Sequence, residues 1–220
     1  MTTTVSRDVI SLNSVEKYYG RYLALKISSL NIPNGIHWIQ GVNGSGKTTL
    51  LKILAGLLPF SGDVALEENI SIKKNPIAYR RLVNYAEAEP LFPSFLTGTD
   101  LLNLFIKTKQ GDKQQSRELI QLLNVNSFID HPVGTYSSGM MKKLSLILAF
   151  IGHPLIILLD EPLVTVDDAS VQIVYSIIEK YHREKGITFL LTSHQHFDEL
   201  KIQLSGRLLV KDQSAKFVSA

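Results

Sequence analysis

Apolar and polar residues follow distinct patterns along the 220-residue chain. Between residues 9 and 32 they alternate in short runs, which predicts half-buried antiparallel strands. The runs at 155–159 and 187–191 are almost wholly apolar, as in parallel strands that are buried on both faces. Because such strands alternate with segments of helical periodicity, the pattern predicts a doubly wound α/β sheet.

The pattern becomes helical over residues 92–150. Apolar residues recur there at helical spacing, around residues 101–106 and 119–123, which predicts helices that pack by one face. We therefore expect the whole chain to form one domain, in which an α/β core (residues 1–91 and 151–220) carries an inserted helical lobe.

Shorter signals complete the predicted core. We expect a turn at residues 61–63, a strand at 81–85 and a terminal hairpin over 207–218. Apolar residues spaced along 171–181 predict one face of a helix that ends near Gly186.

Composition narrows the classes of function. The net charge is +3, which is too mild to indicate nucleic acid as a partner. The chain has no cysteine, so disulfides, thiol nucleophiles and cysteine-ligated metals are excluded. The first residues lack the apolar core of a signal peptide. The apolar stretch at 144–159 is interrupted and shorter than the ~20 residues of a membrane span, so we expect no transmembrane segment in this chain.

One glycine-rich stretch carries the most specific signal. Residues 41–48 have the form G-x-x-x-x-G-K-[ST] and lie between the apolar run 36–39 and a helix-forming run at 49–55. A strand, this loop and a helix in that order form the setting in which the motif binds phosphate. The glycines let backbone N–H groups approach a polyphosphate, and the dipole of the following helix points at the same place. An ordinary glycine turn is the structural alternative.

The residues of this loop take separate parts in the predicted site. Lys47 is expected to reach the β- and γ-phosphates, and the Thr48 hydroxyl to bind Mg²⁺. The remaining nucleotide contacts in this segment are expected from Asn43, Gly44, Ser45, Gly46 and Thr49.

Two acidic residues directly follow the run at 155–159. Because ligands bind at the carboxyl edge of open α/β sheets, Asp160 and Glu161 are placed at the predicted phosphate site. Asp160 is expected to hold Mg²⁺, and Glu161 to orient or deprotonate the attacking water. His194 follows the next strand at the same edge, where we expect it to contact the γ-phosphate. The structural alternatives are acids that merely end a strand and a histidine that serves packing.

Several segments together resemble the ATP-binding subunit of ABC transporters, over nearly the whole chain. Residues 41–48 resemble the family's Walker A loop, and residues 155–161 resemble its Walker B strand with the catalytic glutamate. Further matches lie at Tyr19 (the aromatic residue that stacks on adenine), residues 164–167 (the D-loop) and His194 (the switch histidine).

Residues 136–140 lie where the family's signature, LSGGQ, falls. They precede a helix expected from Met141 onward, so that Ser137, Gly139 and the helix N-terminus would form an anion site. In the family two subunits pair head to tail, and each signature closes over the nucleotide of the other. The resemblance thus implies that Ser137 and Gly139 bind ATP across a dimer. A plain N-cap turn is the alternative.

Two departures from the family's pattern concern coupling. The signature has Ser138 in place of its first glycine and Met140 in place of its glutamine. The glutamine of the family's Q-loop, which senses Mg²⁺ and the transport partner, has no match. Ala88 falls at its position, with Glu87 and Glu89 as candidate substitutes. These departures put the coupling step in question more than ATP binding.

The resemblance implies an α/β fold with a mostly parallel sheet, helices on both faces, an N-terminal antiparallel β part and an inserted helical part. It implies an ATPase subunit, with ATP and Mg²⁺ as cofactors, that drives an ABC transporter. The expected partners are transmembrane permease subunits and a second ATPase chain, identical or related, on the cytoplasmic face of the membrane. Residues 92–95 are a candidate partner-facing patch, although their aromatic side chains equally suit a core, and the signature variant resembles that of export-type members.

Two other functions stay open. One is an ABC-type ATPase that acts on ribosomes or DNA, against which the single cassette, the missing coiled coil and the mild charge argue. The other is a nucleotide-binding regulatory module with little turnover. The altered signature favours it, and the retained Lys47, Asp160, Glu161 and His194 oppose it.

Overall fold

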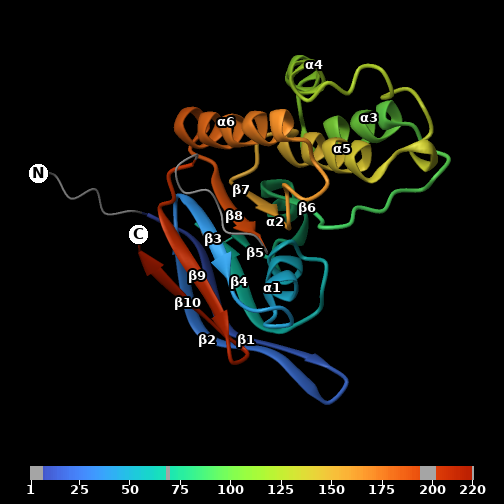
Figure 1. The fold of residues 1–220 in the computed structure, drawn as a ribbon. Helices are drawn as coiled ribbons and strands as arrows, with labels where there is room; N and C mark the ends of the chain where they lie inside the picture. Colours follow the sequence, from blue (N-terminus) through green and yellow to red (C-terminus); the bar gives the residue numbers. More distant parts are fainter. Residues whose placement is uncertain (1–6, 68–69, 194–201, 220) are drawn as a thin grey trace, which may run out of the picture.

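The chain folds into two sheets and a layer of helices (Figure 1). The structure is a computed structural model that describes residues 7–67, 70–193 and 202–219. His194 lies outside these residues. The strands are β1 (Asp8–Tyr19), β2 (Tyr22–Pro33), β3 (Ile36–Gln40), β4 (Ser61–Leu66), β5 (Ile70–Ser71), β6 (Val83–Ala86), β7 (Ile156–Leu159), β8 (Thr188–Thr192), β9 (Gly206–Lys211) and β10 (Ser214–Ser219). The helices are α1 (Lys47–Leu54), α2 (Pro76–Leu82), α3 (Gly98–Lys109), α4 (Lys113–Leu122), α5 (Ser138–Phe150) and α6 (Asp168–Lys185).

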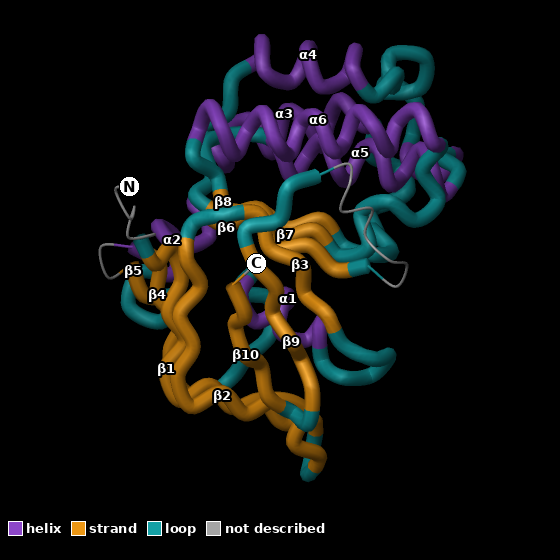
Figure 2. The backbone as a smooth tube through the Cα atoms, turned by 60° about the vertical axis from the view of Figure 1, so that its left-hand side comes forward, coloured by secondary structure: helices purple, strands orange, loops and turns teal. Residues whose placement is uncertain are grey.

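The larger sheet is mostly parallel. Its strand order is β10-β9-β3-β8-β7-β6, and among the described residues only the edge pair β10–β9 is antiparallel. The smaller sheet, in the order β2-β1-β4-β5, is antiparallel throughout. Figure 2 shows β1 and β2 as a long pair beside β9 and β10, with the helices α3 to α6 gathered at the other end of the molecule. The predicted α/β class with a mostly parallel sheet and an antiparallel part is confirmed.

Strand β7 shows why the larger sheet is buried on both faces. Ile156 and Leu158 belong to the apolar cluster that includes α1 and the antiparallel sheet. Ile157 and Leu159 belong to the cluster that includes α3 to α6. Because successive side chains of a strand point to opposite faces, a strand covered on both sides has to be apolar at every position. The helices α1 and α5 therefore lie on opposite faces of this sheet.

Caps and burial explain the helical elements. Thr97 and Asp100 form a reciprocal capping box at the start of α3, and the Asp112 side chain caps α4. Every residue of α5 from Leu144 to Phe150 is buried. This part of the helix is buried on all sides because α3, α4 and the sheet enclose it.

Three local predictions need correction. The strand predicted at 81–85 starts at Val83, because Pro76 opens helix α2, which runs to Leu82. The predicted turn at 61–63 belongs to β4. There the backbone of Gly62 has φ 86°, next to a register irregularity in the β1–β4 pairing, so the strand absorbs the glycine without ending. Helix α5 starts at Ser138 and not at Met141, because Ser137 supplies its N-cap.

The apolar stretch around α5 is no membrane span. Within residues 7–67, 70–193 and 202–219, none of the helices combines the length and the apolar character that crossing a membrane requires.

Candidate phosphate-binding site

The register of the parallel strands brings the predicted site residues to one edge. Ile39 at the end of β3 pairs with Thr192 at the end of β8, and Leu191 of β8 pairs with Leu159 of β7. The loop after β3 and the acids after β7 therefore leave the same carboxyl edge of the sheet. This edge is where open α/β sheets bind their ligands.

The glycine-rich loop folds tightly between β3 and α1. Gly46, the N-cap residue of α1, has φ 106°, a conformation that L side chains rarely adopt. At Gly41 a Cβ atom would lie 2.4 Å from the carbonyl oxygen of Val210, so only glycine fits there. The Lys47 ammonium donates to the carbonyl oxygens of Gly41 (2.8 Å) and Val42 (3.1 Å), which closes the loop around it. A tight glycine loop in front of a helix N-terminus is an arrangement that binds anions.

Hydroxyl groups surround the start of α1. The Ser45 Oγ atom is buried and has no hydrogen-bond partner among the residues that the structure describes, so it is available to a bound ligand. Thr48 is exposed on the first turn of the helix, and Asn43 is exposed in the loop. The Thr49 hydroxyl lies 3.5 Å from the hydroxyl of Tyr19 at the end of β1.

That contact places Tyr19 beside the loop. Its ring is half exposed, and the Lys17 ammonium lies 4.8 Å from the ring centroid. An exposed aromatic face next to a phosphate-binding helix suits a nucleotide base. The geometry thus agrees with the adenine-stacking role expected for Tyr19, which stays a prediction.

Asp160 is held rigidly at the sheet edge. Only 1% of it is exposed. Its Oδ1 atom accepts from the Thr192 hydroxyl at 2.6 Å, and its Oδ2 atom accepts from the Tyr85 hydroxyl at 3.3 Å. Burial raises the pKa of Tyr85 well above its usual range, so that this phenol remains a donor. The two hydroxyl donors fix the orientation of the carboxylate.

Glu161 follows with an unusual backbone. Its φ of 48° is in the left-handed region, although it is not glycine. Its backbone N–H donates to the Thr192 hydroxyl at 2.9 Å, so Thr192 supports both acids. Left-handed conformations of non-glycine residues cost energy and concentrate at functional sites. The strain here is consistent with a catalytic role of Glu161, which no observation yet tests.

The signature segment begins α5. Ser137 caps the helix by accepting from the backbone N–H of Met140 at 3.2 Å, and it is exposed. A Cβ atom at Gly139 would lie 2.8 Å from the carbonyl oxygen of Thr165, so the glycine permits a close contact with the 164–167 segment. The N-cap alternative is thus realised in the structure, and it leaves the exposed hydroxyl free to meet a ligand as well.

A second contact joins α5 to the D-loop segment. The Lys143 ammonium lies 2.7 Å from the carboxylate of Asp167. Hydrogen bonding to Lys143 holds the pKa of Asp167 well below its usual range, and Asp167 also caps α6 by accepting from the backbone N–H of Ser170. The start of α6 is therefore tied to the signature helix.

At the position of the expected Q-loop, Glu87 and Ala88 follow β6. Their backbone carbonyl oxygens accept from the Lys142 ammonium of α5 at 3.0 Å and 2.6 Å. Burial lowers the pKa of Lys142 to about 8. The Glu87 side chain lies 3.6 Å from the ammonium of Lys52 on α1. Of the two candidate substitutes for the missing glutamine, Glu87 is thus engaged with the α1 side of the sheet.

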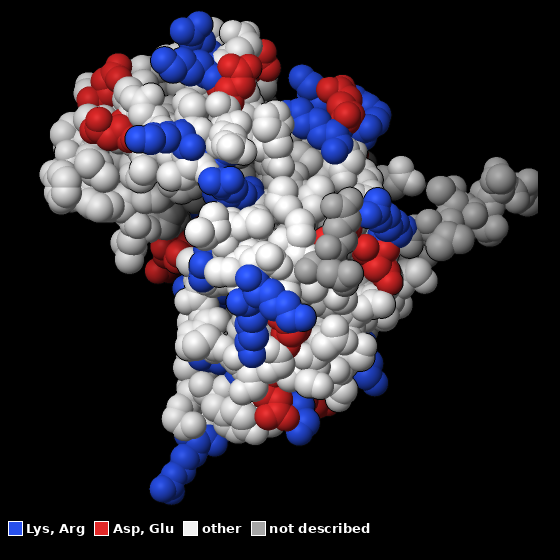
Figure 3. All heavy atoms as spheres, turned by 180° about the vertical axis from the view of Figure 1, so that it is seen from behind, with Lys and Arg blue, Asp and Glu red and all other residues white. Residues whose placement is uncertain are grey.

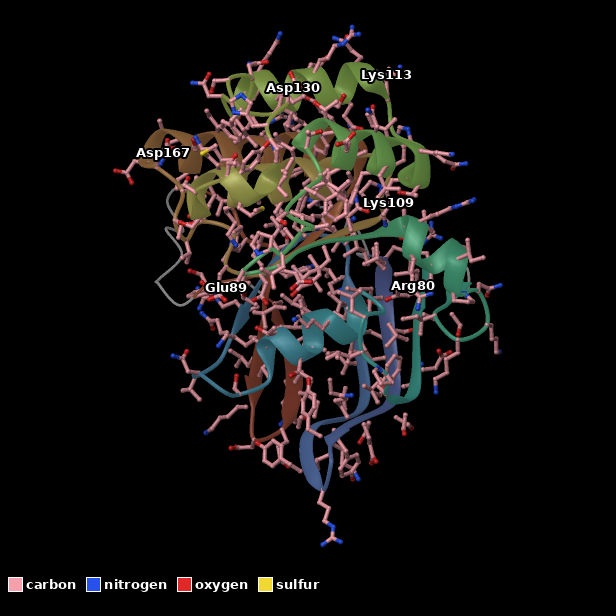
Figure 4. All side chains as sticks on the ribbon, turned by 90° about the vertical axis from the view of Figure 1, so that its right-hand side faces the viewer. Arg80, Glu89, Lys109, Lys113, Asp130 and Asp167 are labelled. Atoms are coloured by element: carbon pink, nitrogen blue, oxygen red, sulfur yellow. The ribbon has the colours of Figure 1, made fainter. Side chains whose placement is uncertain are left out.

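A cleft of about 280 Å³ opens next to this segment, between α2, β6 and the helices α3 and α5. Lys109 spans it: its ammonium donates to the carbonyl oxygens of Arg80 and, at 2.9 Å, of Val83. Figure 4 shows Lys109 above Arg80 on the same side of the molecule. At its rim Leu91 is 91% exposed. Of the predicted partner-facing patch, Phe92 packs against the core and Phe95 is 77% exposed.

Three residues of this edge were missed by the sequence analysis: Tyr85, Lys142 and Thr192. Thr192 carried a signal, because it is the polar residue that ends an apolar strand at the ligand-binding edge. Tyr85 and Lys142 carried none, because their contacts join segments that are far apart in the sequence.

Comparison with known proteins decides between a generic phosphate-binding loop and a specific family. Residues 25–164 match the ABC transporter family. The chain belongs to the ABC transporter family. The match includes the loop, the acids and the signature segment, so these are parts of one ATP-binding cassette.

Known proteins of the ABC transporter family are similar to this chain over most of its length. The cytochrome c biogenesis ATP-binding export protein CcmA of Legionella pneumophila is 35% identical over 189 residues, which cover 86% of this chain and 92% of CcmA. ATP-binding cassette sub-family A member 13 of Homo sapiens is 32% identical over 206 residues, which cover 85% of this chain and 4% of that protein.

Solved ABC structures share the fold. The ATP-binding subunit of an ABC transporter superposes with a TM-score of 0.85 at 18% identity and covers 96% of this chain and 90% of its own. A dimeric ATP-binding cassette bound to ADP and phosphate superposes with a TM-score of 0.78 at 21% identity and covers 96% and 98%. The predicted function is confirmed at the level of the family: the chain is an ATP-binding, ATP-hydrolysing subunit of an ABC transporter.

Proposed function

We propose that the chain hydrolyses Mg-ATP at the carboxyl edge of its larger sheet and transmits the resulting closure, as half of a head-to-tail pair, to membrane-spanning partner subunits. The observation that carries this proposal is the shared edge. There the loop closed by Lys47 lies in register with the strand ends that hold Asp160, Glu161 and Thr192. In this proposal the whole chain acts as one ATP-binding domain, with residues 92–150 as its helical part.

The glycine-rich loop would bind the phosphates. Lys47 would exchange its two carbonyl partners for phosphate oxygens, which accept hydrogen bonds from an ammonium more strongly because they are charged. Backbone N–H groups from Asn43 to Thr49 and the Ser45 hydroxyl, which has no partner in the described part of the chain, would complete the phosphate-binding site. Tyr19 would stack on the base.

The same edge suits Mg²⁺. Within the described residues, no three His, Cys, Asp or Glu side chains gather into a protein-only metal cage. Mg²⁺ next to a nucleotide needs no such cage, because one or two protein oxygens, phosphate oxygens and water fill its coordination. The exposed Thr48 hydroxyl and the Asp160 carboxylate are ligands of this kind. When bound, the ion would neutralise charge on the phosphates.

Glu161 would orient the attacking water and accept its proton. The Thr192 hydroxyl holds its backbone N–H at 2.9 Å and the Asp160 carboxylate at 2.6 Å, so the spacing of the two acids is fixed before the nucleotide binds. Pre-formed geometry of this sort lowers the barrier because no reorganisation is needed during the reaction. We also assign His194 to the γ-phosphate on the resemblance alone.

A second chain would complete the pocket. Ser137 and Gly139 begin α5, whereas Lys47 begins α1 on the opposite face of the sheet. This separation supports contact of the signature with the nucleotide of a partner chain, identical or related. The exposed Ser137 hydroxyl and the α5 N-terminus would supply the donors.

Membrane-spanning partners would dock at the cleft beside residues 87–92. Exposed Leu91 lines this cleft together with the basic Arg80 and Lys109, and the exposed Phe95 follows in the same segment. On the face in Figure 3, side chains of both charges are interspersed, which supports a protein partner over nucleic acid. Docking would keep the chain on the cytoplasmic face of the membrane. The export named for the Legionella relative supports export as the direction of transport.

Phosphate release from ATP by the purified chain tests the proposal. Release should require Mg²⁺ and stop when EDTA is added, because Thr48 and Asp160 hold the nucleotide through the ion. Binding of ATP without any Mg²⁺-dependent release would overturn the proposed mechanism and favour a regulatory module.

A Phe95→Asp exchange tests docking separately. It should leave release by the isolated chain unchanged and reduce co-purification with membrane proteins. Unchanged co-purification would remove Phe95 from the docking surface.

A further inference from the structure

Lys142 is a charged side chain in the interior of the molecule. It lies on α5, and only 1% of it is exposed. Placing an ammonium group away from water costs several kcal/mol unless its hydrogen bonds are replaced. A lysine at such a position therefore has to be held by specific partners.

Those partners are three backbone carbonyl oxygens. The Lys142 ammonium donates to Glu87 at 3.0 Å, to Ala88 at 2.6 Å and to Asp160 at 3.4 Å. An ammonium has three N–H donors, so each donor has one acceptor. The nearby negative charges that favour its protonated form are those of Asp160, Glu161 and Glu89.

The three acceptors belong to two segments that differ in role. Glu87 and Ala88 follow β6 and lead into the cleft, and Asp160 follows β7 and leads into Glu161. Lys142 itself lies five residues after Ser137, in the second turn of α5. A single side chain thus connects the signature helix, the segment beside the cleft and the backbone of the candidate metal ligand.

We propose that Lys142 is a positioning residue of the ATPase: it couples the position of the signature helix and of residues 87–88 to the placement of Asp160 and Glu161. This inference rests on the proposed function. When the signature helix shifts as a partner chain closes on it, Lys142 moves the two strand-end segments with it. The two acids, which Thr192 holds at a fixed spacing, then reach their working position relative to the nucleotide only in the closed pair.

A Lys142→Met exchange tests the coupling, because methionine keeps the shape of the stem and removes all three donors. We expect kcat to fall about tenfold, since small displacements of catalytic groups have effects of this size, while the KM for ATP stays within about twofold. Lys142→Gln keeps two N–H donors and should lose about threefold. Lys113→Met is the matched control, because Lys113 is exposed on α4 (Figure 4). Circular dichroism checks that each variant folds.

A double variant that combines Lys142→Met with Ser137→Ala distinguishes coupling to the signature segment from a role of Lys142 in packing alone. If Lys142 transmits what the signature does, the double variant should be about as slow as the slower single variant, because both changes break one chain of contacts. Multiplied losses in the double variant would overturn the inference. So would a kcat within about twofold of wild type for Lys142→Met, or for Lys142→Gln if the methionine variant does not fold.

The same experiment distinguishes this inference from the proposed function. If wild type releases phosphate with Mg²⁺ and Ser137→Ala slows it, the proposed function stands whatever Lys142 does. If wild type releases no phosphate at all, the proposed function fails first, and the inference fails with it.

Discussion

Two helix N-termini of this chain have the makings of an anion site, and they differ in how complete they are. Helix α1 begins with the buried Lys47, directly after Gly46 at φ 106°, and the buried Ser45 hydroxyl nearby has no hydrogen-bond partner among the described residues. Helix α5 begins directly after Ser137, an exposed serine whose hydroxyl already caps the helix. Both helices direct a positive dipole end outward.

This difference indicates which of the two N-terminal ends, called here the α1 end and the α5 end, can bind an anion without a second chain. The α1 end brings a cation, glycines in left-handed conformations and nearby carboxylates of its own chain, so it can bind a polyphosphate without help. The α5 end brings one hydroxyl and backbone N–H groups, so it gains a ligand only when another surface presents one. In the proposed mechanism, ATP would bind at α1 first, and α5 would close over a partner's nucleotide second.

Removing the Lys47 ammonium from the α1 end should have the largest effect on phosphate release. We expect Lys47→Ala to lower phosphate release about 100-fold or more, because no other described ammonium closes this loop. A phosphate-release assay at saturating Mg²⁺ measures it, with Lys113→Ala as the exposed control. Turnover near wild type would mean that the α1 end is not the site of hydrolysis.

Loosening the acids beside the α1 end should have the next largest effect. Thr192→Val keeps the shape of the side chain but removes the hydroxyl that joins Asp160 and Glu161. We expect kcat to fall about 30-fold with little change in the KM for ATP, because positioning is lost while phosphate contacts remain. Steady-state kinetics decides; a raised KM with an unchanged kcat would show that Thr192 serves binding instead.

A change at the α5 end should cost less, and it should depend on the partner. Ser137→Ala removes an N-cap, which costs about 1 kcal/mol of stability, and should slow turnover about tenfold. Asp112→Ala is a matched control, because it also removes a side-chain N-cap, but from the separate helix α4. Equal losses of turnover in the two variants would reduce the signature to a plain helix cap.

The smallest effect concerns how the helical elements are attached to the core. Burial lowers the pKa of Lys109 from 10.5 to about 8. Between these values the unfolded chain binds more protons than the folded one, so the stability of wild type should rise with pH relative to Lys109→Met. Urea unfolding at pH 7 and pH 10 measures the difference. A difference that stays constant would place the Lys109 ammonium in water.

Much of the fold could be predicted because apolar periodicity reports burial directly. The run at 155–159 is apolar at each position because both faces of β7 are covered, and the same logic identified β3 and β8. Helix α2 was missed because its seven residues are too few for a periodic signal, and only Tyr79 is buried in it.

The candidate site likewise has a part that the sequence predicted and a part that it did not. The glycine-rich loop and the acids after β7 are local patterns, so the sequence identified them before the structure placed them. Thr192, Tyr85 and Lys142 act through contacts between residues that are 18 to 75 positions apart. Such contacts depend on strand order and on helix packing, which one sequence read in order does not specify.

The central claim, that the α5 end completes the α1 end of another chain, is tested most directly by cross-linking. The chain has no cysteine, so two can be introduced as its only cysteines: Asn43→Cys in the loop and Ser138→Cys at the start of α5. Both positions are exposed. A Glu161→Gln background slows hydrolysis and preserves the ATP-bound state. With a short thiol cross-linker, ATP and Mg²⁺ should produce covalent dimers, whereas a cysteine at Lys113 in place of the one at Ser138 should not. Dimers that form equally without ATP, or none with ATP although the variant binds it, would contradict the account.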